Sequence, residues 1–249
     1  MGQEQSTRIN LKPPVSIVSV ADRPPAIGAD EESRAYYPWL PRSLARLVHA
    51  TNNLPLWFFV RGARTILDVG CGVNSPVNYF VSRSQVMDGV DVVPEVLQQA
   101  QSAKYRHLYC ADIRSFSVPQ AYDVVTALDV LEHFTKDEGI RVLEGLEHAA
   151  GRVIVVTPNG FVPQHIPGHP FQEHHSGWAA EDFSRRGYLV YGMFGPRWLR
   201  TGPAVVRFSP KAFWAFVALL ASLVYFWFPR RSFSLLAVYD RANDRRHYP

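Results

Sequence analysis

The sequence predicts an α/β fold in which a mostly parallel sheet carries helices on both faces. Short apolar runs alternate with segments of helical periodicity from about residue 63 to 240, and a glycine-bearing turn follows the first run. The fourth run, Tyr122 to Leu128, is nearly all apolar, as a central parallel strand should be. With 249 residues, 47% of them apolar, the chain can bury the core of one large domain.

The first predicted strand, Thr65 to Val69, runs into a turn at Gly70 to Gly72 and then into a helix start at Val77 to Ser82. This arrangement forms a nucleotide-type ligand site, because the turn exposes main-chain N–H groups and glycine permits close approach of a ligand. Asp68 adds a carboxylate beside the turn.

The second strand, Val86 to Val92, ends near Asp91. An acidic residue about 20 positions after a glycine turn, at the end of the next strand, binds a ribose diol. Further elements follow in order. We expect strands at Arg106 to Cys110, Arg152 to Val156, Tyr188 to Phe194 and Ser234 to Tyr239, and helices at Glu95 to Ala103, Lys136 to Ala149 and Ala180 to Arg186.

Composition excludes several classes. The formal charge of +4 is only mildly basic. The sequence has no run of basic residues interleaved with aromatic residues, so we do not expect a nucleic-acid partner. The two cysteines, Cys71 and Cys110, do not suggest a disulfide framework, and no Cys/His spacing predicts a metal site. No signal-peptide pattern opens the chain, so we expect a cytoplasmic protein.

Two motifs resemble those of the class I S-adenosylmethionine-dependent methyltransferases. Asp68, Gly70 and Gly72 match the D-x-G-x-G part of motif I, although Asn74 stands where a third glycine is usual. The sequence D-V-L-E-H at residues 129–133 is frequent after the fourth strand in small-molecule members. The resemblance implies a Rossmann-like sheet of seven strands, mostly parallel, with the last strand antiparallel between strands five and six.

The resemblance also implies which residues hold S-adenosylmethionine. The strand ends would supply the ribose and adenine contacts, the glycine turn would hold the amino-acid end, and the D-V-L-E-H loop would flank the cofactor. The residues implied are Asp68, Gly70, Cys71, Gly72, Asp91, Val92, Asp112, Ile113, Asp129 and Val130.

Residues 161–178 form a long segment rich in His, Pro and Gly. Such a segment is either a binding loop or lid, or a structural loop with surface histidines. A hydroxyl acceptor needs a base, and histidine is the usual one. Our candidates are His133 on the cofactor loop, then His174 or His175; a structural hydrogen bond is the alternative role for His133.

The N-terminal part divides in two. We expect residues 1–33 to form an irregular lead-in with one short ordered piece around Val15 to Val20. Residues 34–249 would then form the methyltransferase domain. Tyr36 to Val60 has helical periodicity and either covers the ligand or simply packs against the sheet.

Ala212 to Phe228, within an apolar insert over residues 205–231, contains 17 residues without a charge. A single membrane crossing would place the last predicted strand on the far side of the bilayer, away from the sheet that it must join. We therefore expect a helix or helical hairpin that lies on or dips into the cytoplasmic leaflet, which would place the protein at the inner face of a membrane. The alternatives are that this segment packs on the domain itself or in a homodimer interface.

The predicted function is methyl transfer to a hydroxyl, or less favourably a nitrogen, of a small-molecule, glycan or lipid-linked acceptor. Two alternatives from other classes stay open. One is a nicotinamide-dependent oxidoreductase, which the missing third glycine disfavours; the other is a non-catalytic, membrane-associated protein that binds the cofactor.

Overall fold

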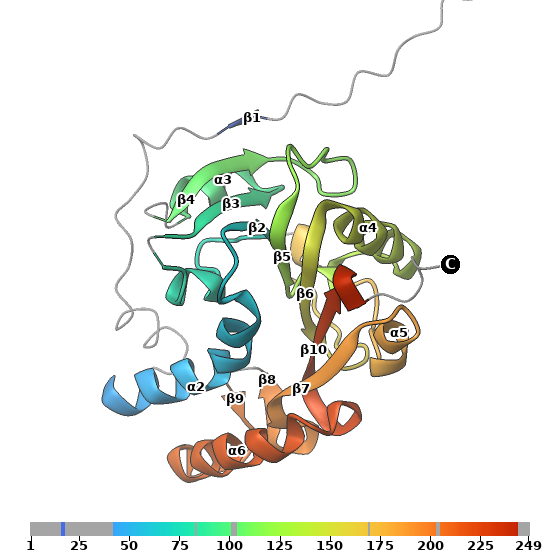
Figure 1. Ribbon diagram of the computed structural model, residues 1–249. Coiled ribbons are helices and arrows are strands. Elements are labelled where there is room, and N and C mark those ends of the chain that lie inside the picture. Colours follow the sequence, from blue (N-terminus) through green and yellow to red (C-terminus); the bar gives the residue numbers. More distant parts are fainter. Residues whose placement is uncertain are drawn as a thin grey trace, which may run out of the picture.

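A central sheet of eight strands organises the computed structural model (Figure 1). The structure describes residues 16–17, 42–82, 84–100, 104–168, 170–202 and 205–243. The sheet strands are β1 (Ser16–Ile17), β2 (Thr65–Val69), β3 (Val86–Asp91), β4 (Tyr105–Cys110), β5 (Tyr122–Leu128), β6 (Ala150–Pro158), β7 (Leu189–Pro196) and β10 (Ser232–Asp240). A separate two-stranded ribbon joins β8 (Arg200–Gly202) to β9 (Val205–Val206).

The strand order is β1-β4-β3-β2-β5-β6-β10-β7. Strands β4, β3, β2, β5 and β6 pair in parallel, whereas β10 lies antiparallel between β6 and β7. The predicted seven-stranded arrangement is confirmed. The sheet has one strand more, because β1 pairs antiparallel with β4 and caps an edge that would otherwise expose unpaired main-chain groups. The rest of the expected lead-in lies outside the described residues.

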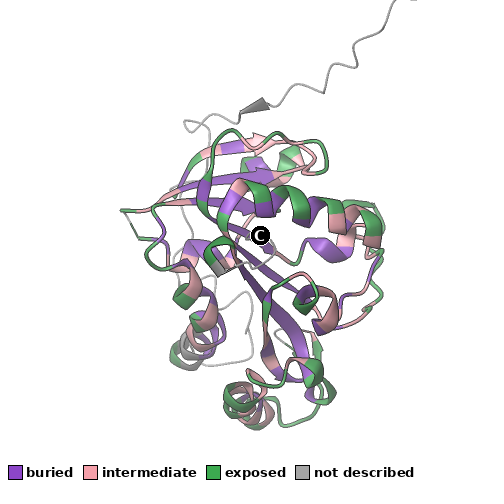
Figure 2. Cartoon of the chain, turned by 45° about the vertical axis from the view of Figure 1, so that its right-hand side comes forward, coloured by how far each residue is buried: buried purple, intermediate pink, exposed green. Residues whose placement is uncertain are grey.

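Helices cover both faces of the sheet, as predicted. They are α2 (Arg42–Val60), α3 (Pro94–Gln99), α4 (Lys136–Ala149), α5 (Ala180–Ser184) and α6 (Lys211–Tyr225). Side chains of α4 and α5 pack in one core layer, and those of α2 and α3 in the other. Figure 2 shows the strands largely buried between helices whose outer faces are exposed. The alternating residues of β10 divide between the layers, since Leu235 and Leu236 belong to different ones.

The helix predicted at Val77 to Ser82 is wrong. Among the described residues between β2 and β3, the chain forms only a 3₁₀ turn, η2 (Pro76–Tyr79). Ser75 caps this turn by accepting a hydrogen bond from the Val77 N–H. The main chain leaves helical geometry at Phe80, and the Gln85 side chain accepts a hydrogen bond from the Ser82 N–H, which turns the chain towards β3.

Helix α3 is also shorter than predicted. It ends at Gln99 because Ala100 adopts an extended ψ of 136°, and residues 101–103 of the predicted helix lie outside the described part. In contrast, α4 has the predicted bounds. Thr135 and Glu138 form a reciprocal capping box at its start, which explains why this boundary was readable from sequence.

The apolar insert forms α6, which connects β7 and β9 to β10. The helix lies very close to β7: a Cβ on Gly192 would come within 2.2 Å of the Tyr225 carbonyl oxygen. None of the described helices is both long and apolar enough to cross a bilayer.

Asp88 anchors the outer half of the sheet. The residue is 0% exposed, and its carboxylate accepts hydrogen bonds from Arg106 Nη2 at 2.6 Å and from the Tyr122 hydroxyl at 2.7 Å. Burial alone would raise the pKa of Asp88, but the hydrogen bonds from Arg106 and Tyr122 outweigh it and hold the pKa below its usual value.

Replacement of Asp88 by Asn should therefore lower the free energy of unfolding by about 1–3 kcal/mol at neutral pH. Because the folded pKa is depressed, this contribution is present above the unfolded value of about 3.9 and is lost as pH falls through the lower folded value. Denaturant unfolding of both proteins at several pH values measures the difference. Substitution of the exposed Asp137 by Asn is the control; a loss for Asp88→Asn that does not shrink in acid would contradict the assignment.

Candidate functional site

A cleft of about 610 Å³ opens at the carboxyl ends of β2, β3, β4 and β5. Its volume suits a small-molecule ligand, and its position at the carboxyl edge of a parallel sheet is where open α/β folds bind ligands. Ten of the thirteen residues predicted for the site line it: Gly70, Gly72, Asp91, Val92, Asp112, Ile113, Asp129, Val130, His133 and His175.

The glycine turn and the β5 loop meet in the wall of this cleft. Gly70 has φ +63°, and a Cβ at this position would lie 2.5 Å from Cγ2 of Val130. The Gly70 N–H donates to the Val90 carbonyl at 2.8 Å, which fixes the turn over β3. Glycine is therefore required here both by the left-handed backbone and by the contact with Val130.

Asp91 lies at the end of β3 and lines the cleft. Its Oδ2 accepts a hydrogen bond from the Gly72 N–H at 3.1 Å, and its Oδ1 accepts one from the Val93 N–H at 3.0 Å. These two bonds fix the carboxylate between the glycine turn and the start of α3. Each oxygen keeps acceptor capacity for a ligand hydroxyl.

Asp112 lines the cleft but already has a strong partner. The Arg114 guanidinium donates to both carboxylate oxygens, with Nη2 2.6 Å from Oδ2, and Nη1 also binds Glu138 Oε1 at 2.8 Å. The hydrogen bonds from Arg114 lower the pKa of Asp112. Arg114 and Glu138 show no sequence signal of a role in this site, because their ion pair joins residues 24 positions apart.

Asp68 and Cys71 lie beneath the cleft, not in its lining. Asp68 is 1% exposed and accepts hydrogen bonds from the Tyr105 hydroxyl and from Thr126 Oγ1, both at 2.7 Å. Burial raises the pKa of Asp68, although these hydrogen bonds oppose the rise. The motif aspartate thus supports the turn from below, and Cys71 packs in the core beside Gly89.

Asp129 begins the loop after β5 in a strained conformation, with φ +53°. Its N–H donates to the Val156 carbonyl at 2.8 Å, which holds the strained residue in place. Asp129 is exposed on the side that faces the cleft. The surrounding protein still desolvates its carboxyl group, which raises the pKa of Asp129 to about 6.

The next carboxylate, Glu132, was not singled out from sequence although it lies inside the quoted D-V-L-E-H motif. It belongs to the 3₁₀ turn η3 (Leu131–His133), is 3% exposed and accepts a hydrogen bond from Thr157 Oγ1 at 3.1 Å. Burial, and then the charge of Asp129, raise the pKa of Glu132 well above its usual value.

Two of the three candidate histidines stand together. The rings of His133 and His174 are 4.9 Å apart in an edge-on arrangement. Burial lowers the pKa of both, so both are neutral at pH 7. His133 and His175 line the cleft, whereas His174 lies behind His133.

The histidine-rich segment is fastened to η3 by main-chain bonds. The N–H groups of His175 and Ser176 both donate to the Glu132 carbonyl, at 2.8 and 3.1 Å. The segment also brings Gln164, Phe171 and Gln172 to the cleft, so it forms part of the ligand site. His169 lies outside the described residues.

Comparison with known proteins defines the class. Residues 67–149 match the family model described as a methyltransferase domain. A crystal structure of the small RNA methyltransferase HEN1 shares the fold, with TM-score 0.51 and 19% identity over 78% of this chain and 25% of that one. The chain therefore contains a class I methyltransferase domain of the S-adenosylmethionine-dependent type. This match favours the methyltransferase prediction over the oxidoreductase alternative.

Named relatives match about half of the chain. A protein named ubiquinone biosynthesis O-methyltransferase from Pseudomonas savastanoi is 29% identical over 51% of this chain and 60% of its own length. One of the same name from Idiomarina loihiensis is 26% identical over 56% of this chain and 63% of its length. The matching region thus spans less than two thirds of these relatives.

Substitution of Gly70 by Ala should destabilise the fold by about 1–3 kcal/mol, since the methyl group would clash with Val130 and the residue would keep a positive φ. Denaturant unfolding measures the loss. The double variant Gly70→Ala/Val130→Ala should lose less than the sum of the two single losses, because the clash is removed. Strictly additive losses would contradict the contact.

Proposed function

We propose that the protein transfers the methyl group of S-adenosylmethionine to a hydroxyl oxygen of a small-molecule, glycan or lipid-linked acceptor. The observation that carries the proposal is the Asp91 carboxylate, held at the cleft by N–H groups of Gly72 and Val93 with acceptor capacity left for a ribose diol. We assign this activity to a domain over residues 34–249 with the apolar insert at 205–231.

The cleft residues fit the cofactor. The turn leaves room for close approach at Gly72, where the nearest atom to an added Cβ would be the Gly70 carbonyl oxygen at 4.0 Å, and the apolar side chains of Val92 and Ile113 can cover the faces of a planar base. Asp112 and the Ile113 main chain would bind its edge, although Arg114 shares that carboxylate. Asp129 would face the cationic end of the cofactor.

The cofactor supplies a methyl group that its sulfonium already activates. The residues of the cleft therefore have to align the acceptor and exclude water, a contribution of up to about 7–11 kcal/mol. A hydroxyl acceptor also has to lose a proton. His133 and His175 line the cleft, and neutral His133 can accept a proton there. The O-methyltransferase name of the curated relatives supports oxygen as the acceptor atom.

Asp91→Asn should weaken S-adenosylmethionine binding about 10- to 100-fold in calorimetry, because hydrogen bonds to a charged acceptor contribute about 1.5–3 kcal/mol. Glu144→Gln, an exposed substitution on α4, is the control and should bind like the parent. Equal affinity of Asp91→Asn and the parent protein would refute the ribose assignment.

The outer face of α6 supports a lipid-linked acceptor reached at a membrane surface. Exposed apolar side chains recur along one stripe of the helix and continue after its end, with Leu223 64% and Trp227 70% exposed. The stripe consists of Phe213, Phe216, Leu220, Leu223, Val224, Trp227 and Phe228. The exposed Leu54, Trp57 and Phe58 of α2 continue this apolar surface across the contact between α2 and α6.

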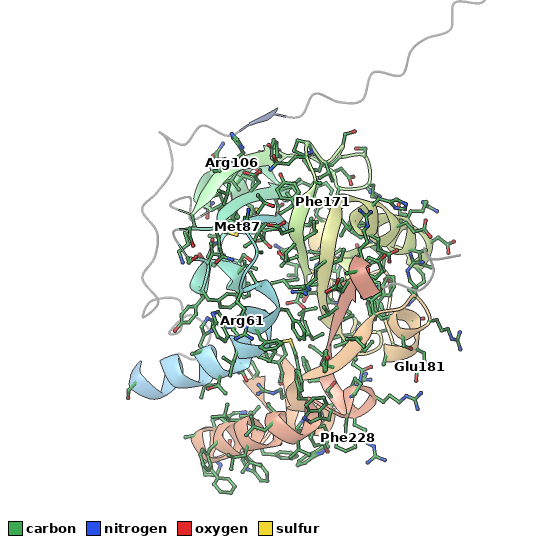
Figure 3. All side chains as sticks on the ribbon, in the orientation of Figure 1. Arg61, Met87, Arg106, Phe171, Glu181 and Phe228 are labelled. Carbon is green, nitrogen blue, oxygen red and sulfur yellow. The ribbon has the colours of Figure 1, made fainter. Side chains whose placement is uncertain are left out.

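Basic groups border this surface. The Arg61 guanidinium stacks 4.4 Å from the Phe58 ring centroid, and Arg230 and Arg231 follow the stripe with exposed side chains. Figure 3 labels Arg61 and Phe228 in the lower half of the molecule, near α2 and α6 respectively. An apolar stripe bordered by arginines suits an anionic lipid surface, where the aromatic rings enter the interface.

A groove of about 470 Å³ between α2 and α6 opens on the same surface. Its walls are mostly apolar, so it suits a chain of hydrocarbon and not a charged group. The residues that line it include Leu54, Phe58, Tyr191, Leu223 and Phe226. The groove therefore supports an acceptor with an apolar tail.

The variant Phe213→Ser/Phe216→Ser/Leu223→Ser should lower binding to vesicles with anionic lipid at least about tenfold, because three exposed apolar side chains no longer enter the interface. Flotation measures the bound fraction. Phe161→Ser, at a residue 52% exposed outside α6, is the matched control. Unchanged flotation together with loss of a dimer in ultracentrifugation would instead assign the stripe to a second copy of the chain.

A further inference from the structure

Three potential metal ligands meet at one wall of the cleft. Glu132 and His133 come from η3, and His174 comes from the histidine-rich segment more than 40 positions later. One ligand atom from each of the three residues lies within 4.8 Å of the other two. Sequence spacing did not predict this group, because only the fold of the long segment brings His174 to the other two.

Both histidine rings are oriented by main-chain carbonyls. The Nδ1 atom of His133 lies 3.1 Å from the Glu173 carbonyl oxygen, and that of His174 lies 2.7 Å from the Val162 carbonyl oxygen. A carbonyl oxygen only accepts, so each Nδ1 carries the proton and each Nε2 carries the lone pair. Metal-binding histidines show this arrangement, in which an outer carbonyl fixes the ring and its tautomer.

Glu132 supplies the oxygen ligand of the group. Thr157 Oγ1 donates to Oε2 and orients the carboxylate, whose residue is 3% exposed. In the described part of the chain the ion pairs that form do not include Glu132. The carboxylate of Asp129 lies nearby and adds negative charge to the same wall. A buried carboxylate with two imidazole lone pairs and no basic partner is a suitable donor set for a cation.

We propose that Glu132, His133 and His174 bind one divalent transition-metal cation, with zinc as the representative ion. Two imidazole nitrogens beside one carboxylate oxygen favour a transition metal such as zinc, iron or nickel over the magnesium and calcium that oxygen-only sites select. Four-coordinate zinc separates its ligand atoms by about 3.4 Å, so the cation would draw the three groups inward by about an ångström.

The proposed cation has a consequence for the acceptor, which rests on the proposed function. Since three protein ligands leave a coordination position open and His133 lines the cleft, that position faces the ligand space. An acceptor hydroxyl would coordinate there through oxygen, and because the cation would occupy the His133 lone pair, the acceptor's proton would leave to water and not to His133. The acceptor class is thereby narrowed to compounds with a metal-binding hydroxyl, such as a phenol or a diol.

The test is a titration of the metal-free full-length protein with Co²⁺ and with Zn²⁺, followed by visible absorption and by calorimetry. The parent protein should bind one equivalent of each, and Co²⁺ should develop the d–d bands of a low-coordinate site. His174→Ala should weaken binding about 100-fold, and Glu132→Gln about tenfold or more. His148→Ala, an exposed histidine on α4, should bind like the parent and serves as the matched control.

Absence of stoichiometric binding by the parent, or equal affinity of the parent and His174→Ala, would overturn the proposal. S-adenosylhomocysteine binding without metal, measured on the same preparations, separates the possible failures. Loss of metal binding with retained S-adenosylhomocysteine binding shows that a variant is folded. Metal binding without any S-adenosylhomocysteine binding by the parent would leave the metal site standing and contradict the proposed function.

Discussion

The contact between Gly70 and Val130 is the constraint on which the site depends. It joins the turn after β2 to the loop after β5, and there is no room for a side chain at Gly70. The turn presents the Gly72 N–H to Asp91, while the loop carries Asp129, Glu132 and His133. This close contact between the Gly70 main chain and the Val130 side chain thus sets the distance across the cleft between the turn after β2 and the loop after β5.

Several carboxyl groups surround this cleft, and each is stabilised by different interactions. Main-chain N–H groups hold Asp91, the Arg114 guanidinium neutralises Asp112, and burial raises the pKa of Asp129. Only Glu132 combines deep burial with two neighbouring imidazoles, which is why we assign it to a cation. A cleft with this charge favours a ligand with a positive centre, as a sulfonium has.

Much of the fold was predictable because local pattern and tertiary packing agree. Strands β2 and β5 have the predicted bounds because each is an apolar run with clear ends. Helix α4 also has its predicted bounds, and a capping box marks its start. The helix after the glycine turn failed because side-chain bonds of Ser75 and Gln85 outweigh weak helical periodicity. In the site, strand ends were readable, but the depth of Asp68 and the approach of His174 to Glu132 depend on contacts between distant segments.

The most direct test of the central claim is a crystal structure of the protein with S-adenosylhomocysteine. The account predicts the ribose hydroxyls within hydrogen-bond distance of both Asp91 oxygens and the amino-acid end over the turn at Gly70. A ligand bound elsewhere, or an Asp91 carboxylate turned away from a ligand in this cleft, would contradict it.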